Sequence, residues 1–109
     1  MKTMTASELA EKLTKNEEVI ILDVRSTDKY NTYHIDNENV RSLNIEKSNI
    51  FSLNEDDMDV ISSLPKNEEI IVTCTTGNSA RKCAEILSEK GFNVTVLSGG
   101  VTAWKELND

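Results

Sequence analysis

Apolar residues gather in short unbroken runs, and polar stretches with helical spacing separate these runs. Residues 19–22 and 70–72 are wholly apolar, and residues 94–97 are nearly so. Such runs are typical of strands covered on both faces, as in a parallel sheet that lies between helices. A weaker run at residues 40–45 predicts a further strand.

The first helix is predicted from a capping box and a regular apolar stripe. Residues 5–8 read Thr-Ala-Ser-Glu, and apolar side chains then recur at positions i, i+3, i+4 and i+7. This pattern predicts a helix that ends near Lys15. Farther along, Asn54 could cap a helix that ends before Pro65 and carries Met58, Ile61 and Leu64.

Two more helices are predicted in the second half of the chain. One follows Cys74, places Ala80, Cys83, Ala84 and Leu87 on one face, and ends at Gly91. The other follows Gly99-Gly100 and carries Val101, Trp104 and Leu107. Strands and helices therefore alternate, without an internal repeat or a linker. We expect one α/β domain over residues 1–109.

The charge balance narrows the choice of partners. The chain has 19 acidic and 12 basic residues, so nucleic acid and anionic membranes would be repelled on average. With no apolar run of membrane-spanning length and no basic-then-apolar leader, we expect a cytoplasmic protein. Two cysteines and one histidine make neither a disulfide framework nor a metal site.

The strongest chemical signal is the segment around Cys74. A buried-type strand leads into Cys74, a short polar loop with one glycine follows, and a helix then begins. The amides of residues 75–80 and the positive end of that helix can converge on the sulfur, which favours a thiolate. A buried structural cysteine is the alternative, and the order of elements favours a reactive one.

For the other candidate residues, a structural role is favoured over a chemical one. Asp23 and Arg25 end the first long strand, at the edge where parallel sheets bind ligands, although a structural ion pair is favoured over direct chemistry. A structural hydrogen-bonding role is favoured for His34. Cys83 could resolve an oxidised Cys74, but its apolar helix face favours core packing.

Five segments, in this order, resemble the single-domain rhodanese-like sulfurtransferases. They are Leu22-Asp23-Val24-Arg25, Tyr30 with His34-Ile35, Asn44-Ile45, Cys74-Thr75-Thr76-Gly77-Asn78, and residues 97–104, Leu-Ser-Gly-Gly-Val-Thr-Ala-Trp. The resemblance spans nearly the whole chain. It implies an α/β, doubly wound, mostly parallel sheet of about five strands, with helices on both faces.

The resemblance also implies a function. A catalytic Cys74 would take a sulfane sulfur as a persulfide and pass it to a thiol, to cyanide or to a sulfur-accepting protein. The substrate would be bound by Thr75, Thr76, Gly77, Asn78, Ser79 and Ala80, with Asp23, Arg25 and Arg81 in support. No cofactor or metal is implied, and we expect a monomer.

Two departures from the family pattern bear on the sulfur donor. The family's loop carries an arginine that holds anionic donors, and Ser79 stands at that position, with Arg81 two residues farther on. The connection after His34-Ile35 is also longer than usual. We therefore expect thiosulfate to be used less well than a persulfide or a polysulfide.

Two other functions remain open on the same residues. A phosphatase or arsenate reductase needs a cysteine and an arginine at a fixed spacing, and six residues between Cys74 and Arg81 are one too many. A sulfur carrier or regulatory module with little turnover is the second alternative. The missing loop arginine supports it, whereas the intact Cys74 argues against a purely structural relic.

Overall fold

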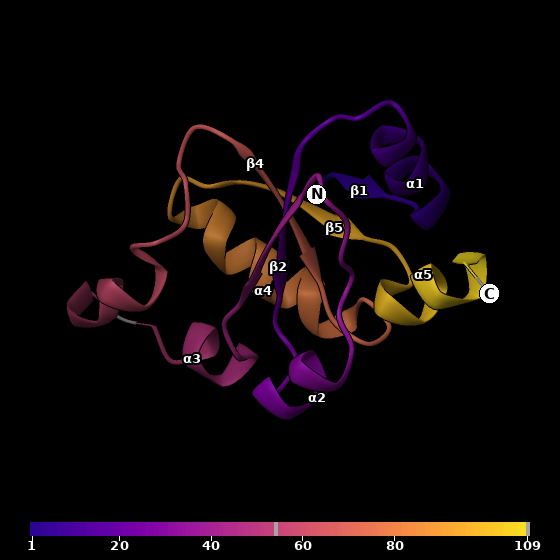
Figure 1. Ribbon diagram of the computed structural model, residues 1–109. Helices are drawn as coiled ribbons and strands as arrows, with labels where there is room; N and C mark the ends of the chain where they lie inside the picture. The colour runs from indigo at the N-terminus through magenta and orange to yellow at the C-terminus, as the bar shows by residue number, and fades with distance from the viewer. Residues whose placement is uncertain (54, 109) are drawn as a thin grey trace.

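The sheet is parallel throughout the part of the chain that the structure describes. The computed structural model describes residues 1–53 and 55–108 (Figure 1). Within these residues, five strands pair in the order β1-β5-β4-β2-β3. Their bounds are β1 Thr3–Met4, β2 Val19–Asp23, β3 Val40–Asn44, β4 Glu69–Thr73 and β5 Asn93–Leu97. The predicted α/β sheet of about five strands is thus confirmed.

Helices cover both faces of this sheet (Figure 1). Alternate residues of β2 belong to different cores, with Ile20 and Leu22 in one and Val19 and Ile21 in the other. This double burial explains the unbroken apolar runs in the sequence. The helical segments are α1 Ala6–Thr14, α2 Thr27–Thr32, α3 Lys47–Phe51, the 3₁₀ helix Glu55–Ile61, α4 Asn78–Glu89 and α5 Gly100–Asn108.

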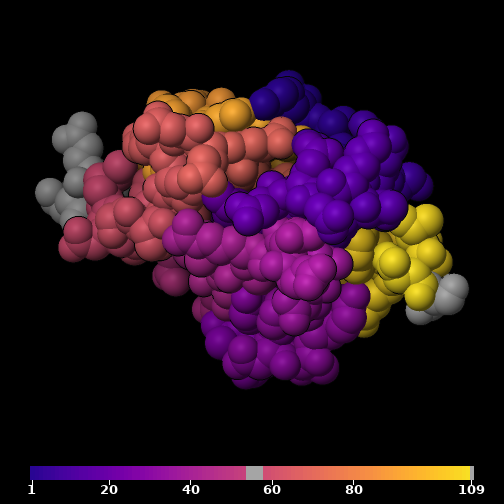
Figure 2. Space-filling model, turned by 45° about the horizontal axis from the view of Figure 1, so that its top comes forward, coloured from indigo at the N-terminus to yellow at the C-terminus, as the bar shows by residue number. Residues whose placement is uncertain are grey.

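The two ends of the chain lie on the same side of the sheet. Helix α5 contacts α1, and Val101 and Trp104 of α5 share a core with Leu9 and Leu13 of α1. The space-filling view shows the yellow C-terminal segment against the violet N-terminal half of the chain (Figure 2). Helix α4 packs on β4, β5 and α3 and belongs to the other core.

The predicted capping and termination signals are present. Thr5 caps α1, its hydroxyl accepts the Glu8 amide, and the Glu8 carboxylate accepts the Thr5 amide, so the capping box is complete. Helix α4 buries the four predicted residues and ends at Glu89, with Lys90 as its C-cap, followed by Gly91 with a φ of 93°. A left-handed glycine directly after the cap is the expected stop.

The segment before Pro65 differs from its prediction. Residues 55–61 form a 3₁₀ helix that ends at Ile61, so Leu64 lies beyond it, although both side chains are buried. Met58 is exposed. The apolar spacing therefore marked two buried positions, Ile61 and Leu64, without forming one regular helix. Asn54, the predicted cap, lies outside the described residues. Leu107 is on α5 but is exposed.

Candidate functional site

Cys74 lies directly after β4, where the chain turns toward α4. Its Sγ accepts hydrogen bonds from the Gly77 amide at 3.0 Å and from the Ala80 amide at 3.3 Å. Ala80 is in the first turn of α4, whose first residue is Asn78. The sulfur therefore caps the positive end of a 12-residue helix. Two amide donors and a helix terminus are thus directed at the sulfur, an arrangement that can hold a thiolate or an anionic group bonded to the sulfur.

The loop around the sulfur depends on glycine at two places. Gly77 precedes α4 with a φ of 106°, which is outside the range that L side chains favour. Gly100 opens α5 so close to the loop that a Cβ there would lie 2.3 Å from the Cys74 carbonyl oxygen. The Val101 amide donates to that oxygen at 2.9 Å, and the Thr102 amide donates to the Thr75 carbonyl at 3.0 Å. The start of α5 thus holds the Cys74 loop in place through these two backbone hydrogen bonds.

A cavity of about 450 Å³ opens beside Cys74. Cys74 itself is 6% exposed, so a small molecule would reach the sulfur through this cavity. Loop residues and residues at the carboxyl end of the sheet line it: Val24, Arg25, Ser26, Lys29, Lys47, Thr75, Thr76, Asn78 and Ser79. Of the six loop residues predicted to bind substrate, Thr75, Thr76, Asn78 and Ser79 line this cavity. The other two, Gly77 and Ala80, contribute amides to the sulfur.

Sequence reasoning missed two lysines that line this cavity. Lys29 comes from α2, and Lys47 begins α3. The Lys47 Nζ donates to the Ser79 Oγ at 3.3 Å. A signal for Lys47 was present, because it follows the end of β3 and side chains after parallel strands meet at one edge of the sheet.

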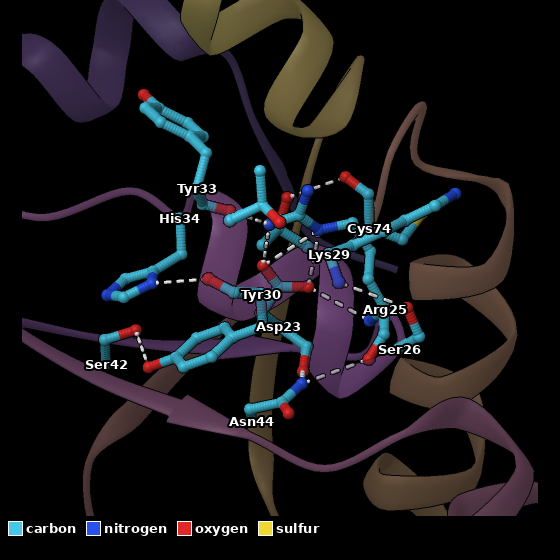
Figure 3. A network of polar contacts seen from close by, with 12 residues as sticks. Asp23, Arg25, Ser26, Lys29, Tyr30, Tyr33, His34, Ser42, Asn44 and Cys74 are labelled. Carbon is cyan, nitrogen blue, oxygen red and sulfur yellow. Dashed lines mark hydrogen bonds and ion pairs between the residues drawn. The ribbon is translucent and has the colours of Figure 1, made fainter.

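Asp23 and Arg25 form a buried ion pair beside the cavity. The Arg25 Nε donates to both Asp23 carboxylate oxygens at 3.0 Å, and a terminal nitrogen of Arg25 donates to Oδ2 at 2.7 Å. The side chain of Asp23 is 2% exposed and that of Arg25 is 9% exposed. Arg25 also donates to the Tyr33 carbonyl at 2.6 Å. Figure 3 shows this pair next to Cys74. Arg25 lines the cavity and Asp23 does not, so the geometry matches the structural interpretation that was favoured for Asp23.

His34 belongs to a separate polar cluster. Its ring stacks on Tyr30 with centroids 4.0 Å apart, its Nδ1 lies 2.9 Å from the Tyr30 carbonyl oxygen, and the Tyr30 hydroxyl pairs with the Ser42 hydroxyl (Figure 3). His34 does not line the Cys74 cavity. This placement agrees with the hydrogen-bonding role favoured from the sequence.

Arg81 and Cys83 lie away from the cavity although both are on α4. Arg81 is exposed and lines a different depression, formed with Ser98 and Gly99. Cys83 is fully buried on the apolar face. Burial raises the pKa of the Cys83 thiol to about 12, with a smaller contribution in the same direction from Cys74. Cys83 is therefore a neutral core thiol at neutral pH.

The described residues include neither a cluster of metal-binding side chains nor a membrane-spanning helix. In residues 1–53 and 55–108, no three His, Cys, Asp or Glu side chains gather in a way that could bind a metal ion. Over the same ranges, the helices are too short or too polar to span a bilayer.

Comparison with known proteins identifies the family. The model of the rhodanese-like domain matches residues 5–107. The chain belongs to the rhodanese-like domain family. It is 30% identical over 109 residues to a protein of Shewanella oneidensis named thiosulfate sulfurtransferase GlpE, covering 98% of this chain and 95% of that protein. The protein of the same name in Coxiella burnetii is 33% identical over 94 residues, covering 85% of this chain and 78% of the relative.

Solved structures agree with this assignment. A rhodanese-like domain protein from Staphylococcus aureus superimposes with a TM-score of 0.79 at 30% identity, covering 95% of this chain and 91% of that one. Family, relatives and fold together support sulfurtransferase activity for this rhodanese-like chain.

Proposed function

We propose that this protein transfers a sulfane sulfur through a persulfide on Cys74. The observation that carries the proposal is the Cys74 sulfur, which accepts the Gly77 and Ala80 amides at the start of α4 and faces an open cavity. The Cys74 thiolate attacks the outer sulfur of the donor. A sulfur–sulfur bond to Cys74 forms as the donor's own sulfur–sulfur bond breaks, and the rest of the donor leaves with the electron pair.

The second half of the cycle regenerates the enzyme. A thiolate or cyanide attacks the outer sulfur of the Cys74 persulfide, and the Cys74 thiolate leaves with the electron pair of the broken bond. The persulfide carries one negative charge, and the same loop amides and helix terminus that favour a thiolate also favour this charge. Neither half needs an oxidant, a metal or a cofactor.

Three classes of donor suit this chemistry: low-molecular-weight persulfides, polysulfides and thiosulfate. The missing arginine at Ser79 argues against thiosulfate, whereas the names of the Shewanella and Coxiella relatives argue for it. We place thiosulfate among the donors on the strength of those relatives. The acceptor is a small thiol, cyanide or a sulfur-accepting protein.

A phosphatase function is weaker on this geometry. It would need a guanidinium beside the sulfur, and Arg81 is outside the Cys74 cavity while Arg25 is paired with Asp23.

The carrier alternative shares the persulfide and differs in turnover. Thiocyanate production with thiosulfate and cyanide separates the two, because an enzyme turns over many times and a carrier transfers about one sulfur per chain. Sustained hydrolysis of an aryl phosphate without sulfur transfer would contradict the proposal.

A further inference from the structure

The cavity beside Cys74 contains positive charge that does not come from the loop. Arg25, Lys29 and Lys47 all line it. The Arg25 charge is offset by the bidentate contact with Asp23. The two lysines therefore supply the cavity's remaining positive charge, and they come from α2 and α3.

The backbone of Lys47 fixes the position of this residue, and its side chain reaches the loop that follows Cys74. Its amide donates to the Val24 carbonyl at 3.0 Å, which anchors the residue beside the end of β2. Its Nζ donates to the Ser79 Oγ at 3.3 Å. The ammonium group thus lies next to the loop position at which an arginine is absent. Lys29 lines the same cavity; its amide donates to the Ser26 hydroxyl, and its carbonyl accepts the Tyr33 amide.

The described partner of the Lys47 ammonium is an uncharged hydroxyl. Among the described side chains, no carboxylate lies within 4.0 Å of its Nζ, and the neighbouring Glu46 carboxylate accepts the Thr27 amide at 2.7 Å instead. Serine offers a neutral hydroxyl that holds the lysine without cancelling its charge. An anion that enters the cavity therefore meets an ammonium group whose described hydrogen-bond partner is uncharged.

We propose that Lys47 is the donor-selecting residue of this enzyme, and that it binds the sulfonate group of thiosulfate from α3 in place of a loop arginine. The inference rests on the proposed persulfide function. Thiosulfate carries two negative charges, and one of its sulfurs bears three oxygens. Cys74 attacks the other sulfur, sulfite leaves with the electron pair, and the sulfonate end lies against the Lys47 ammonium as charge builds on the leaving group. A donor without a sulfonate gains less from Lys47.

Lys47→Gln tests this inference because it removes the charge and keeps most of the side-chain length. The residue is exposed, so the fold should not change. We expect kcat/KM for thiosulfate to fall on the order of tenfold. With the persulfide of 2-mercaptoethanol as donor, which bears one charge and no sulfonate, kcat/KM should change less than threefold. Cyanide serves as the common acceptor at one fixed ionic strength.

Lys82→Gln is the matched control. It removes the same charge from an exposed position on α4 that does not line the cavity. Both donors should keep their wild-type kcat/KM in this variant. Equal losses of thiosulfate kcat/KM in the Lys47 and Lys82 variants would show that the effect comes from net charge alone, and would overturn the inference.

A rescue variant distinguishes a local contact from a general loss. In the Lys47→Gln background, Ser79→Arg supplies a guanidinium to the same part of the cavity and should restore thiosulfate kcat/KM at least severalfold. In the wild-type background the gain should be smaller, because the new arginine would adjoin Lys47, and the two changes should therefore be non-additive. Additive effects, or an equal fall for both donors in Lys47→Gln, would also overturn the inference.

Failure of this inference is separable from failure of the proposed function. Intact mass after treatment with the persulfide donor should show one added sulfur in both wild type and Lys47→Gln. If both gain the sulfur and thiosulfate use is unchanged by Lys47→Gln, only the role of Lys47 is wrong. If neither gains it, the persulfide function itself is wrong.

Discussion

Cys74 and Cys83 show how surroundings alone give two identical side chains different chemistry. Both are buried, but Cys74 accepts two amides at a helix terminus and opens to a cavity, whereas Cys83 packs among apolar side chains. Because burial raises the pKa of Cys83 to about 12, its reactive thiolate appears only as the pH approaches that value. At neutral pH, Cys83 should be inert.

Alkylation tests this difference between the two thiols. Native protein treated with iodoacetamide at pH 8 should gain one label on Cys74, and Cys83→Ala should be labelled at the same rate. Cys83→Ala should also keep sulfur-transfer activity within about threefold of wild type and lose about 1 kcal/mol of unfolding free energy. A loss of turnover beyond tenfold in a folded Cys83→Ala protein would restore the idea of a resolving cysteine.

Asp23 and Arg25 provide a second prediction at this scale. Asp23→Asn leaves a nearly buried guanidinium without its counter-charge, so the free energy of unfolding should fall by about 3 kcal/mol. Urea denaturation measures the change, and Asp28→Asn on the exposed face of α2 is the matched control. A change below about 0.5 kcal/mol would contradict the stabilising role of the pair.

Residue-level prediction from the sequence was strongest where local order determines geometry. Cys74 is predicted at the carboxyl end of a strand, before a short loop and a helix, and in the structure it directly follows β4, in the loop that leads into α4. The contact of Lys47 with Ser79 joins residues 32 positions apart, and only the fold brings them together. Arg81, two residues beyond the usual position, was placed among the supporting residues but faces a different depression. The rotation of α4 determines that direction.

At the scale of elements, the sequence predicted long periodic segments and missed short ones. Helix α1 and helix α4 carry apolar stripes and clear end signals, and both are present as predicted. Strand β1 has 2 residues and α3 has 5, which is too short for periodicity to identify them. Both elements owe their form to neighbours: β1 pairs with β5, and α3 packs on α4.

The contact between α5 and the Cys74 loop leads to a prediction at the scale of secondary-structure elements. Gly100→Ala would place a Cβ 2.3 Å from the Cys74 carbonyl oxygen and 2.7 Å from the Thr75 carbonyl oxygen, so α5 and the loop must separate. Activity should fall at least tenfold and unfolding free energy by about 2 kcal/mol. Activity and urea denaturation are measured on the same preparation.

Gly91→Ala is the control for this prediction, because it also substitutes a glycine of positive φ. Its Cβ would meet only the Lys66 Nζ at 3.5 Å, far from the loop. The variant should lose about 1 kcal/mol of stability and keep its activity. Wild-type activity in Gly100→Ala would show that α5 does not hold the Cys74 loop in place.

For the whole molecule, the doubly wound sheet explains why the site lies where it does. Strands β2, β3 and β4 end at the same edge of the sheet, and the segments that follow them contribute Arg25, Lys47 and Cys74 to a single cavity. A chain with a net charge of −7 thereby presents local positive charge to an anionic donor. The predicted parallel sheet indicated that ligands bind at this edge. The lysines that line the cavity could be identified only from the packed structure.

The central claim is that Cys74 carries the transferred sulfur, and intact mass spectrometry tests it most directly. Wild-type protein incubated with thiosulfate or with a persulfide donor, and freed of excess donor, should gain the mass of one sulfur atom. Cyanide should then remove this sulfur and release an equal amount of thiocyanate. Cys74→Ser should stay folded and gain nothing. A wild-type protein that gains no sulfur from either donor, or a Cys74→Ser protein that gains as much as wild type, would contradict the account.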